Sequence, residues 1–179
     1  MQNDVFALVS AANKLFQTTL IKSSDTIDYL KRRGISGKTA AKFGLGFSTV
    51  DLIKFFEHEP TSVLDSTGLF VEKYGKTYPR FSGRLMFPIK NIEGQVCGFG
   101  GRVLTDSEQP KYLNSPETPI FKKSHLIYGL HEAKGAIKDG KRAVVVEGYM
   151  DVISAHQAGI ENVVGSMGTA CTVQQIELI

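Results

Sequence analysis

Two acidic residues stand where a short apolar run meets a helix. Glu147 directly follows the run Ala143–Val146, and Asp151 lies in the first turn of a helix predicted over Met150–Gln157. Ligands bind at the carboxyl ends of parallel strands, and a carboxylate there can hold Mg²⁺, which takes oxygen ligands. The competing interpretation is a first-turn acid that meets the helix N-terminus favourably. A metal pair for phosphoryl transfer needs further acids, and no Asp-x-Asp pair follows Glu147, so the site is incomplete.

The run Gly98–Arg102, which reads GFGGR, could bring the backbone close to a phosphate, because glycine leaves room for such an approach. The run leaves a predicted strand instead of opening a helix, and it does not match the dinucleotide-binding fingerprint. A bulge or a turn is therefore the competing interpretation, and the sequence leaves both open.

Basic and aromatic side chains on either side of this run could bind a nucleic acid. Arg80 and Arg84 precede a predicted strand at Leu85–Ile89, and Lys111 and Tyr112 follow the glycine-rich run. Arginine and lysine contact phosphates, and tyrosine can stack on unpaired bases. The competing interpretation is a buried ring beside basic chains whose stems are buried. Residues 76–123 carry eight basic and four acidic side chains, a balance of +4, while the whole chain carries +3.

The remaining reactive residue types give no site. Cys97 and Cys171 are far apart and lack a CxxC partner, so we expect no structural zinc and interpret both as buried, reduced thiols of a cytosolic protein. The four histidines show no ligand spacing. No apolar run reaches about 18 residues, so we expect no membrane partner. The first residues read as an amphipathic helix and not as a signal peptide.

The elements that must position these residues fall into three groups. Helices are predicted within the first 66 residues: one over residues 6–20, one capped by Ser24 and closed by Gly34, one capped by Ser36 and closed by Gly44, and one over Asp51–Glu57. Strand formers follow at Phe70–Tyr78 with a turn at Gly75, and a hairpin joins Leu85–Ile89 to Gln95–Phe99. Ser115 is predicted to cap a helix with Pro116 at its first position.

The last part of the chain changes to an α/β pattern. A helix over Leu126–Lys138 precedes the run Ala143–Val146, which reads as a strand buried on both faces, and a second strand is predicted at Asn162–Gly165. With the helix between them these strands form a βαβ unit. Thr172 starts a last helix, in which we expect the chain to end. The predicted class is α+β, with a helical and antiparallel first part and a partial parallel sheet.

Six runs of this sequence occur in the order found in bacterial DnaG-type primases. They are Tyr29–Ser36 (YLKRRGIS), Lys42–Phe47 (KFGLGF), Arg80–Ile89 (RFSGRLMFPI), Gly98–Arg102, Lys111–Thr118 (KYLNSPET) and Glu147–Val152 (EGYMDV). The last two are highly specific. The chain therefore resembles the RNA-polymerase domain of these primases along nearly its whole length.

The resemblance implies an N-terminal subdomain over residues 1–124 and a truncated TOPRIM subdomain over 125–179. Such enzymes copy single-stranded DNA into short RNA primers from ribonucleoside triphosphates with Mg²⁺ or Mn²⁺. Carried over, Glu147 is the first TOPRIM acid, a metal ligand or a general acid/base, and Asp151 is the supporting acid of the same motif. The resemblance thus implies that both are catalytic residues. The basic and aromatic residues that the resemblance places in the template and nucleotide cleft are Arg80, Arg84, Arg102, Lys111, Tyr112 and Lys123.

The resemblance also implies parts that this sequence lacks. The zinc ribbon, the later Asp-rich TOPRIM motifs, the following helical bundle and the domain that binds the replicative helicase are missing, so we expect the chain alone to be inactive. Cys171 replaces an aliphatic residue of the family. The implied location is the cytoplasm, in association with the nucleoid.

Two other classes remain open. The chain could be a stand-alone module that binds single-stranded nucleic acid without polymerase activity. It could also belong to another TOPRIM enzyme, a topoisomerase or an OLD-type nuclease, although KYLNSPET argues against both.

Overall fold

A four-stranded antiparallel sheet lies at the centre of the part of the chain that the structure describes. Its strands pair in the order β1 (Gly46–Ser48), β4 (Arg84–Lys90), β5 (Val96–Val103) and β6 (Tyr112–Asn114). The computed structural model describes residues 2–49, 51–105, 109–168 and 170–179. Strands β4 and β5 form the hairpin that the sequence predicts, and the Asn91 backbone N–H donates to the Gln95 carbonyl to close its turn.

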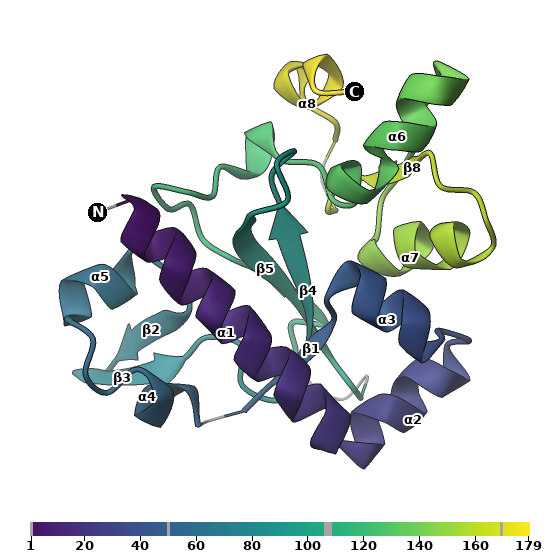
Figure 1. Cartoon of the computed structure of the whole chain (residues 1–179). Helices are drawn as coiled ribbons and strands as arrows, with labels where there is room; N and C mark the ends of the chain where they lie inside the picture. Colours follow the sequence, from purple (N-terminus) through teal and green to yellow (C-terminus); the bar gives the residue numbers. More distant parts are fainter. Residues whose placement is uncertain (1, 50, 106–108, 169) are drawn as a thin grey trace.

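Helix α1 (Gln2–Lys22) covers one face of this sheet (Figure 1). Phe16 of α1 packs with Met86 and Phe99, and the rings of Phe16 and Phe99 meet edge to face with centroids 5.3 Å apart. Leu85 and Phe87 belong to a second cluster on the opposite face, because side chains alternate along a strand. The sheet therefore separates two apolar layers.

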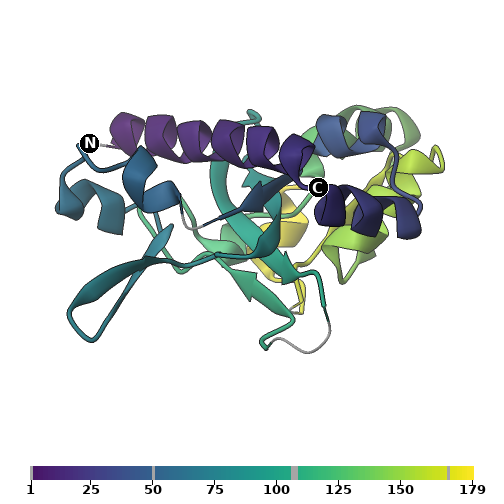
Figure 2. The same cartoon turned by 90° about the horizontal axis from the view of Figure 1, so that it is seen from below.

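The first part of the chain adds short helices and a hairpin. Helices α2 (Ser24–Arg32) and α3 (Gly37–Phe43) follow α1, and α4 (Leu52–Phe55) and α5 (Thr61–Asp65) precede the paired strands β2 (Phe70–Lys73) and β3 (Lys76–Pro79). Ser36 caps α3 as predicted by accepting from the Thr39 N–H at 3.2 Å, and Gly44 closes it at φ 67°. Figure 2 shows the β2–β3 hairpin extending away from the central sheet.

The last part of the chain contains the predicted βαβ unit. Strands β7 (Val144–Val146) and β8 (Val163–Gly165) pair in parallel, and α7 (Tyr149–Gln157) connects them. A 3₁₀ turn η1 (Lys123–His125) and α6 (Leu130–Gly140) precede β7, and α8 (Val173–Glu177) follows β8. The class is α+β, and this βαβ unit contributes side chains to the second apolar cluster. Figure 1 shows it in green and yellow beside the central sheet. No helix within the described ranges is long and apolar enough to cross a membrane.

The starts of α2 and α6 differ from the prediction. Ser23, not Ser24, caps α2, because its side chain accepts from the Thr26 N–H. The predicted helix over Leu126–Lys138 starts only at Leu130, since Tyr128 pairs with Gly165 as an isolated bridge.

The C-terminal helix and the predicted Pro116 helix also differ. Helix α8 begins after Thr172 as predicted and ends at Glu177, before the last residue. No helix starts at Pro116; the Ser115 hydroxyl instead accepts from the Phe99 N–H at 2.9 Å.

The strand β7 is more exposed than its apolar sequence predicts. Val144 is 39% exposed and Val145 is 44% exposed, whereas Val163 and Val164 of β8 are buried. Among the described residues β7 pairs with β8 alone, and packing partners cover only part of its surface. The prediction of a strand buried on both faces is therefore wrong for the chain as it stands.

Candidate nucleic-acid and metal site

The two predicted acids lie together at the carboxyl end of β7. Glu147 is exposed directly after the strand, and its backbone carbonyl accepts from the Gly168 N–H at 3.0 Å. Asp151 lies in the first turn of α7, and its carboxylate accepts from the N–H of Gly148, the residue before the helix, at 3.2 Å. Among the described residues no three His, Cys, Asp or Glu side chains gather to hold a metal. Glu147 is thus the acid free of a capping role, with Asp151 beside it.

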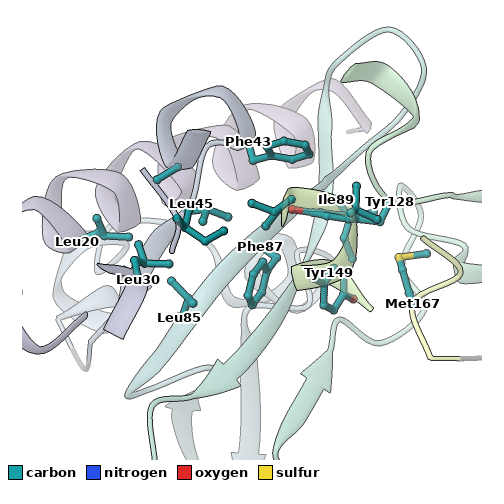
Figure 3. Close-up of a cluster of buried hydrophobic side chains, with 14 of the residues drawn as sticks. Leu20, Leu30, Phe43, Leu45, Leu85, Phe87, Ile89, Tyr128, Tyr149 and Met167 are labelled. Carbon is teal, nitrogen blue, oxygen red and sulfur yellow. The ribbon is translucent and has the colours of Figure 1, made fainter. Parts of the chain in front are cut away.

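Tyr149, which lies between the two acids in the sequence, connects them to the central sheet. The Tyr149 hydroxyl donates to the Asn114 side-chain oxygen at 2.5 Å, and the Asn114 amide donates to the Met167 carbonyl at 3.5 Å. The Tyr149 ring stacks on Phe87 at 5.0 Å and meets Tyr128 edge to face at 4.7 Å (Figure 3). Burial raises the pKa of Tyr149 well above its ordinary value, so this hydroxyl stays a donor. The segment Glu147–Asp151, which we call the acid loop, is therefore fixed against β6.

The glycines of the GFGGR run make this packing possible. A Cβ atom at Gly100 would lie 2.4 Å from Cζ of Tyr149, and one at Gly98 would lie 2.5 Å from Cδ2 of Phe121. All eight residues of β5 are buried. The run lies inside β5 and pairs with β4, so the predicted bulge or turn at the end of a strand is wrong. Its glycines leave room for neighbouring rings, and its burial argues against a phosphate loop.

The predicted basic residues differ sharply in exposure. Arg102 is only 3% exposed, and its guanidinium carbon lies 5.0 Å from the centre of the Tyr29 ring and 5.6 Å from that of Tyr112. Arg84 is 7% exposed, and its Nη1 donates to the Pro110 carbonyl at 2.8 Å. Both arginines therefore lie beneath the surface and support the segment that follows.

The segment above these arginines is exposed. Lys111 and Tyr112 are exposed, Tyr112 by 40%, and the Lys111 carbonyl accepts from the Val103 N–H at 3.2 Å. Arg80 is half-buried; its Nε donates to the Asn114 carbonyl at 3.3 Å, and burial lowers its pKa.

Lys123 lies in a different place. It begins the 3₁₀ turn η1, where its N–H donates to the Glu117 carboxylate at 3.0 Å and its carbonyl accepts from Gln175 at 3.0 Å. The structure thus brings Arg80, Arg84, Arg102, Lys111 and Tyr112 to β6 and its neighbours, while Lys123 borders the C-terminal helix.

Comparison with known proteins identifies the family. A family model for the N-terminal domain of the DNA primase catalytic core matches residues 15–134, and a TOPRIM domain model matches residues 141–179. The chain belongs to the DNA primase family. The DNA primase of Legionella pneumophila is 42% identical over 98% of this chain and 31% of its own length, and that of Deinococcus radiodurans is 43% identical over 100% and 32%.

Solved primase structures share the fold. The RNA polymerase domain of Mycobacterium tuberculosis primase is 34% identical with a TM-score of 0.92, covering 99% of this chain and 60% of that one. A DnaG primase catalytic domain bound to single-stranded DNA is 39% identical with a TM-score of 0.91, covering 99% and 57%. This chain therefore spans about a third of the curated primases it matches and over half of the solved catalytic domains.

Sequence reasoning assigned no role to three residues that organise the site in this primase fold. Tyr149 and Asn114 connect the acid loop to β6, and Tyr29 of α2 contacts Arg102. All three lie inside the motif runs YLKRRGIS, KYLNSPET and EGYMDV, which is the signal that could have found them. A separate apolar cavity of about 420 Å³ lies between the end of α1, α2 and α3 and contains none of the predicted site residues.

Proposed function

We propose that this chain forms the template-binding and first metal-binding part of a DNA primase. The longer protein would synthesise short RNA primers on single-stranded DNA from ribonucleoside triphosphates during replication. The observation that carries the proposal is the position of β6. Its first residue, Tyr112, is exposed next to Lys111, and its last residue, Asn114, accepts a hydrogen bond from Tyr149 of the acid loop. One strand thus links a surface suited to a nucleic acid with a carboxylate suited to a metal.

Single-stranded DNA is the proposed partner of the Lys111–Tyr112 surface. An exposed ammonium group suits a phosphate, and an exposed tyrosine ring suits an unpaired base. The related catalytic domain bound to single-stranded DNA supports this choice, as does the Mycobacterium tuberculosis domain in complex with a duplex that has a 6-nucleotide overhang. Arg80 and Lys123 are proposed as further contacts, and the buried Arg84 and Arg102 as supports of this surface.

Glu147 is the proposed ligand of Mg²⁺ or Mn²⁺. TOPRIM domains in general bind metal, and the exposed carboxylate after β7 offers the oxygen donor that such ions prefer. Asp151 shapes the loop by accepting from Gly148 and supplies nearby negative charge. When bound, the metal would neutralise charge on the transferring phosphoryl group. Glu147 would hold it, and the hydrogen bond from Tyr149 to Asn114 fixes the position of the loop that carries Glu147 relative to β6.

The remaining partners follow from membership of the primase family. We propose ribonucleoside triphosphates as substrates and the replicative helicase as a partner through another part of the longer protein. A location in the cytoplasm with the nucleoid follows from the DNA partner. We further propose a division into residues 1–124 and 125–179, supported by the turn η1 and by the bridge through which Tyr128 joins Gly165 of β8.

A salt series on a labelled single-stranded DNA tests the template surface. Fluorescence anisotropy should show binding whose log–log salt slope changes by about −0.7 for each phosphate contact. Lys111→Ala should weaken binding and flatten that slope by about one contact. Lys14→Ala, on an exposed position of α1 across the sheet, is the matched control and should leave both unchanged. Equal effects of the two substitutions would remove Lys111 from the site.

Primer synthesis separates the enzyme from the alternative, a stand-alone binding module. The 179-residue chain should bind template without extending it, because its described residues hold no third acid near Glu147 and Asp151. Detectable primers from the purified chain would contradict the need for further carboxylates. Restored synthesis on joining the chain to the rest of a related primase would favour the enzyme over the stand-alone module.

A further inference from the structure

A stack of arginine and tyrosine side chains with a buried middle lies beside the proposed template surface. Its members are Arg33, Tyr29, Arg102 and Tyr112, which we call the arginine–tyrosine stack. The guanidinium carbons of Arg33 and Arg102 lie 5.4 Å and 5.0 Å from the centre of the Tyr29 ring, and Arg102 also lies 5.6 Å from the Tyr112 ring. The Arg33 Nε donates to the Tyr29 hydroxyl at 3.1 Å.

The exposed fraction of the side chains differs along this stack, as expected if its buried members hold an exposed ring in place. Tyr29 is 5% exposed and Arg102 is 3% exposed, whereas Tyr112 is 40% exposed. A cation that faces an aromatic ring away from water is held more strongly than one at the surface. The buried pair of Tyr29 and Arg102 is therefore the fixed middle of the stack. It lies between the exposed Arg33 and the Tyr112 ring, which a ligand can reach.

The ring of Tyr112 contacts the side chains of Arg102 and Tyr149, which lie outside its own strand. Strand β6 has three residues, and backbone pairing fixes the Tyr112 main chain opposite Arg102 but not the direction of its ring. The planar guanidinium of Arg102 can lie flat against a ring, which a lysine ammonium group cannot do. The Tyr112 ring also meets the Tyr149 ring, with ring centroids 6.2 Å apart.

We infer that Tyr29 is a positioning residue for template binding: it fixes Arg102, and Arg102 fixes the Tyr112 ring for stacking on an unpaired base. This inference rests on the proposed function, since it names what orients the template surface. It also gives the buried Arg102 a role that requires no phosphate contact. The same stack reaches the acid loop through Tyr149, so template and metal sites share one support.

Base stacking and phosphate binding can be measured separately, which tests the inference. The probe is a single-stranded DNA with 2-aminopurine, a base whose fluorescence falls when an aromatic ring stacks on it. Tyr29→Leu should remove most of the fluorescence loss at saturating protein and weaken binding about fivefold to tenfold, because stacking on one base contributes an effect of this order. The salt slope should stay unchanged, since Lys111 and the other phosphate contacts remain.

Tyr29→Phe is the matched variant. It keeps the ring under Arg102 and removes only the hydroxyl that accepts from Arg33, so fluorescence and affinity should stay within about twofold of the original chain. If Tyr29→Leu does not fold, as judged by circular dichroism, Arg102→Lys replaces it. That variant keeps the charge and loses the planar contact with both rings, and it should show the same loss of base stacking.

The outcomes separate the inference from the function on which it rests. Absence of salt-dependent binding by the original chain would remove the proposed template surface. If the original chain binds without a change in fluorescence, the positioning role is overturned and template binding remains. The same holds if Tyr29→Leu, or its substitute Arg102→Lys, shows the full fluorescence loss of the original chain. A loss of base stacking at constant salt slope, with recovery in Tyr29→Phe, supports the inference.

Discussion

Replacing Gly100 by alanine should push Tyr149 of α7 away from the face of the central sheet on which it packs. The added Cβ would lie 2.4 Å from Cζ, 2.5 Å from Cε2 and 2.6 Å from the hydroxyl oxygen of Tyr149. Real Cβ contacts essentially never fall below 3.0 Å, so the ring or the strand has to move. The ring is held by stacking on Phe87, by the edge contact with Tyr128 and by the bond to Asn114. Little freedom remains to absorb the clash.

The cost follows from the contacts that such a movement breaks. Losing the hydrogen bond to Asn114 costs about 1 kcal/mol, and disturbing the stacked pair with Phe87 costs roughly 0.5–1.5 kcal/mol. Added volume in a packed core costs about 1–3 kcal/mol in similar cases. We therefore expect Gly100→Ala to lower the free energy of unfolding by about 2–3 kcal/mol.

Urea denaturation followed by circular dichroism measures this change. With a denaturant slope of about 2 kcal/mol per molar, the midpoint should fall by about 1–1.5 M. The matched control is Gly135→Ala in the interior of α6, where an added Cβ meets nothing within 4 Å. Removing a helix-interior glycine should raise the free energy of unfolding by about 0.5–1 kcal/mol, the opposite sign.

An unchanged midpoint in Gly100→Ala would refute the reasoning. It would mean that β5 and the TOPRIM part do not pack closely through Tyr149. A second check uses the double variant Gly100→Ala with Tyr149→Leu, whose loss should be smaller than the sum of the two single losses, because both act on the same contact. Strict additivity would show that the alanine is destabilising for a reason unrelated to Tyr149.

Three further predictions concern other buried groups. Glu132→Gln should lower the free energy of unfolding by about 1–3 kcal/mol, because it leaves the Lys90 ammonium without its charge partner. This ammonium is largely buried and lies 2.5 Å from Glu132. Urea denaturation measures the change, and the double variant Lys90→Met with Glu132→Leu should recover part of the loss. Burial lowers the pKa of His156, whose ring bonds the Val163 carbonyl. Its stabilising effect is thus complete above pH 6.5 and declines as pH falls further, so His156→Gln should flatten the dependence of the urea midpoint on pH between 7.5 and 5. Burial raises the pKa of Cys97 to about 11, so a thiol reagent at pH 8 should label the half-buried Cys171 first and Cys97 only on unfolding; rapid labelling of both would contradict this.

Local chemistry made several elements predictable. Ser36 and Gly44 cap α3 because a hydroxyl satisfies an N-terminal N–H and a glycine accepts a left-handed conformation, whatever the helix packs against. The hairpin through Gly94 and the βαβ unit follow in the same way from turn residues and apolar periodicity. The position of Glu147 after β7 also follows from the order of elements alone.

Exposure and pairing could not be predicted in this way. The run at Leu126–Tyr128 has helical composition, yet Tyr128 pairs with Gly165 because a strand 37 residues further along the chain lies beside it. Ser115 reads as a helix cap and instead satisfies the Phe99 N–H of a neighbouring strand. Such partners are distant in sequence, and local propensity yields to them.

The sequence by itself determined the family, the α+β class and the presence of an acid at the end of a parallel strand, because motif runs, periodicity and caps are properties of neighbouring residues. Only the tertiary structure decided what each basic residue does. Arg102 and Lys111 are both cations and lie nine positions apart in the sequence. Strand β5 is buried and places Arg102 between two tyrosine rings, whereas Lys111 is exposed to water. Burial depends on every element packed around a residue, and that sum is fixed only when the chain has folded.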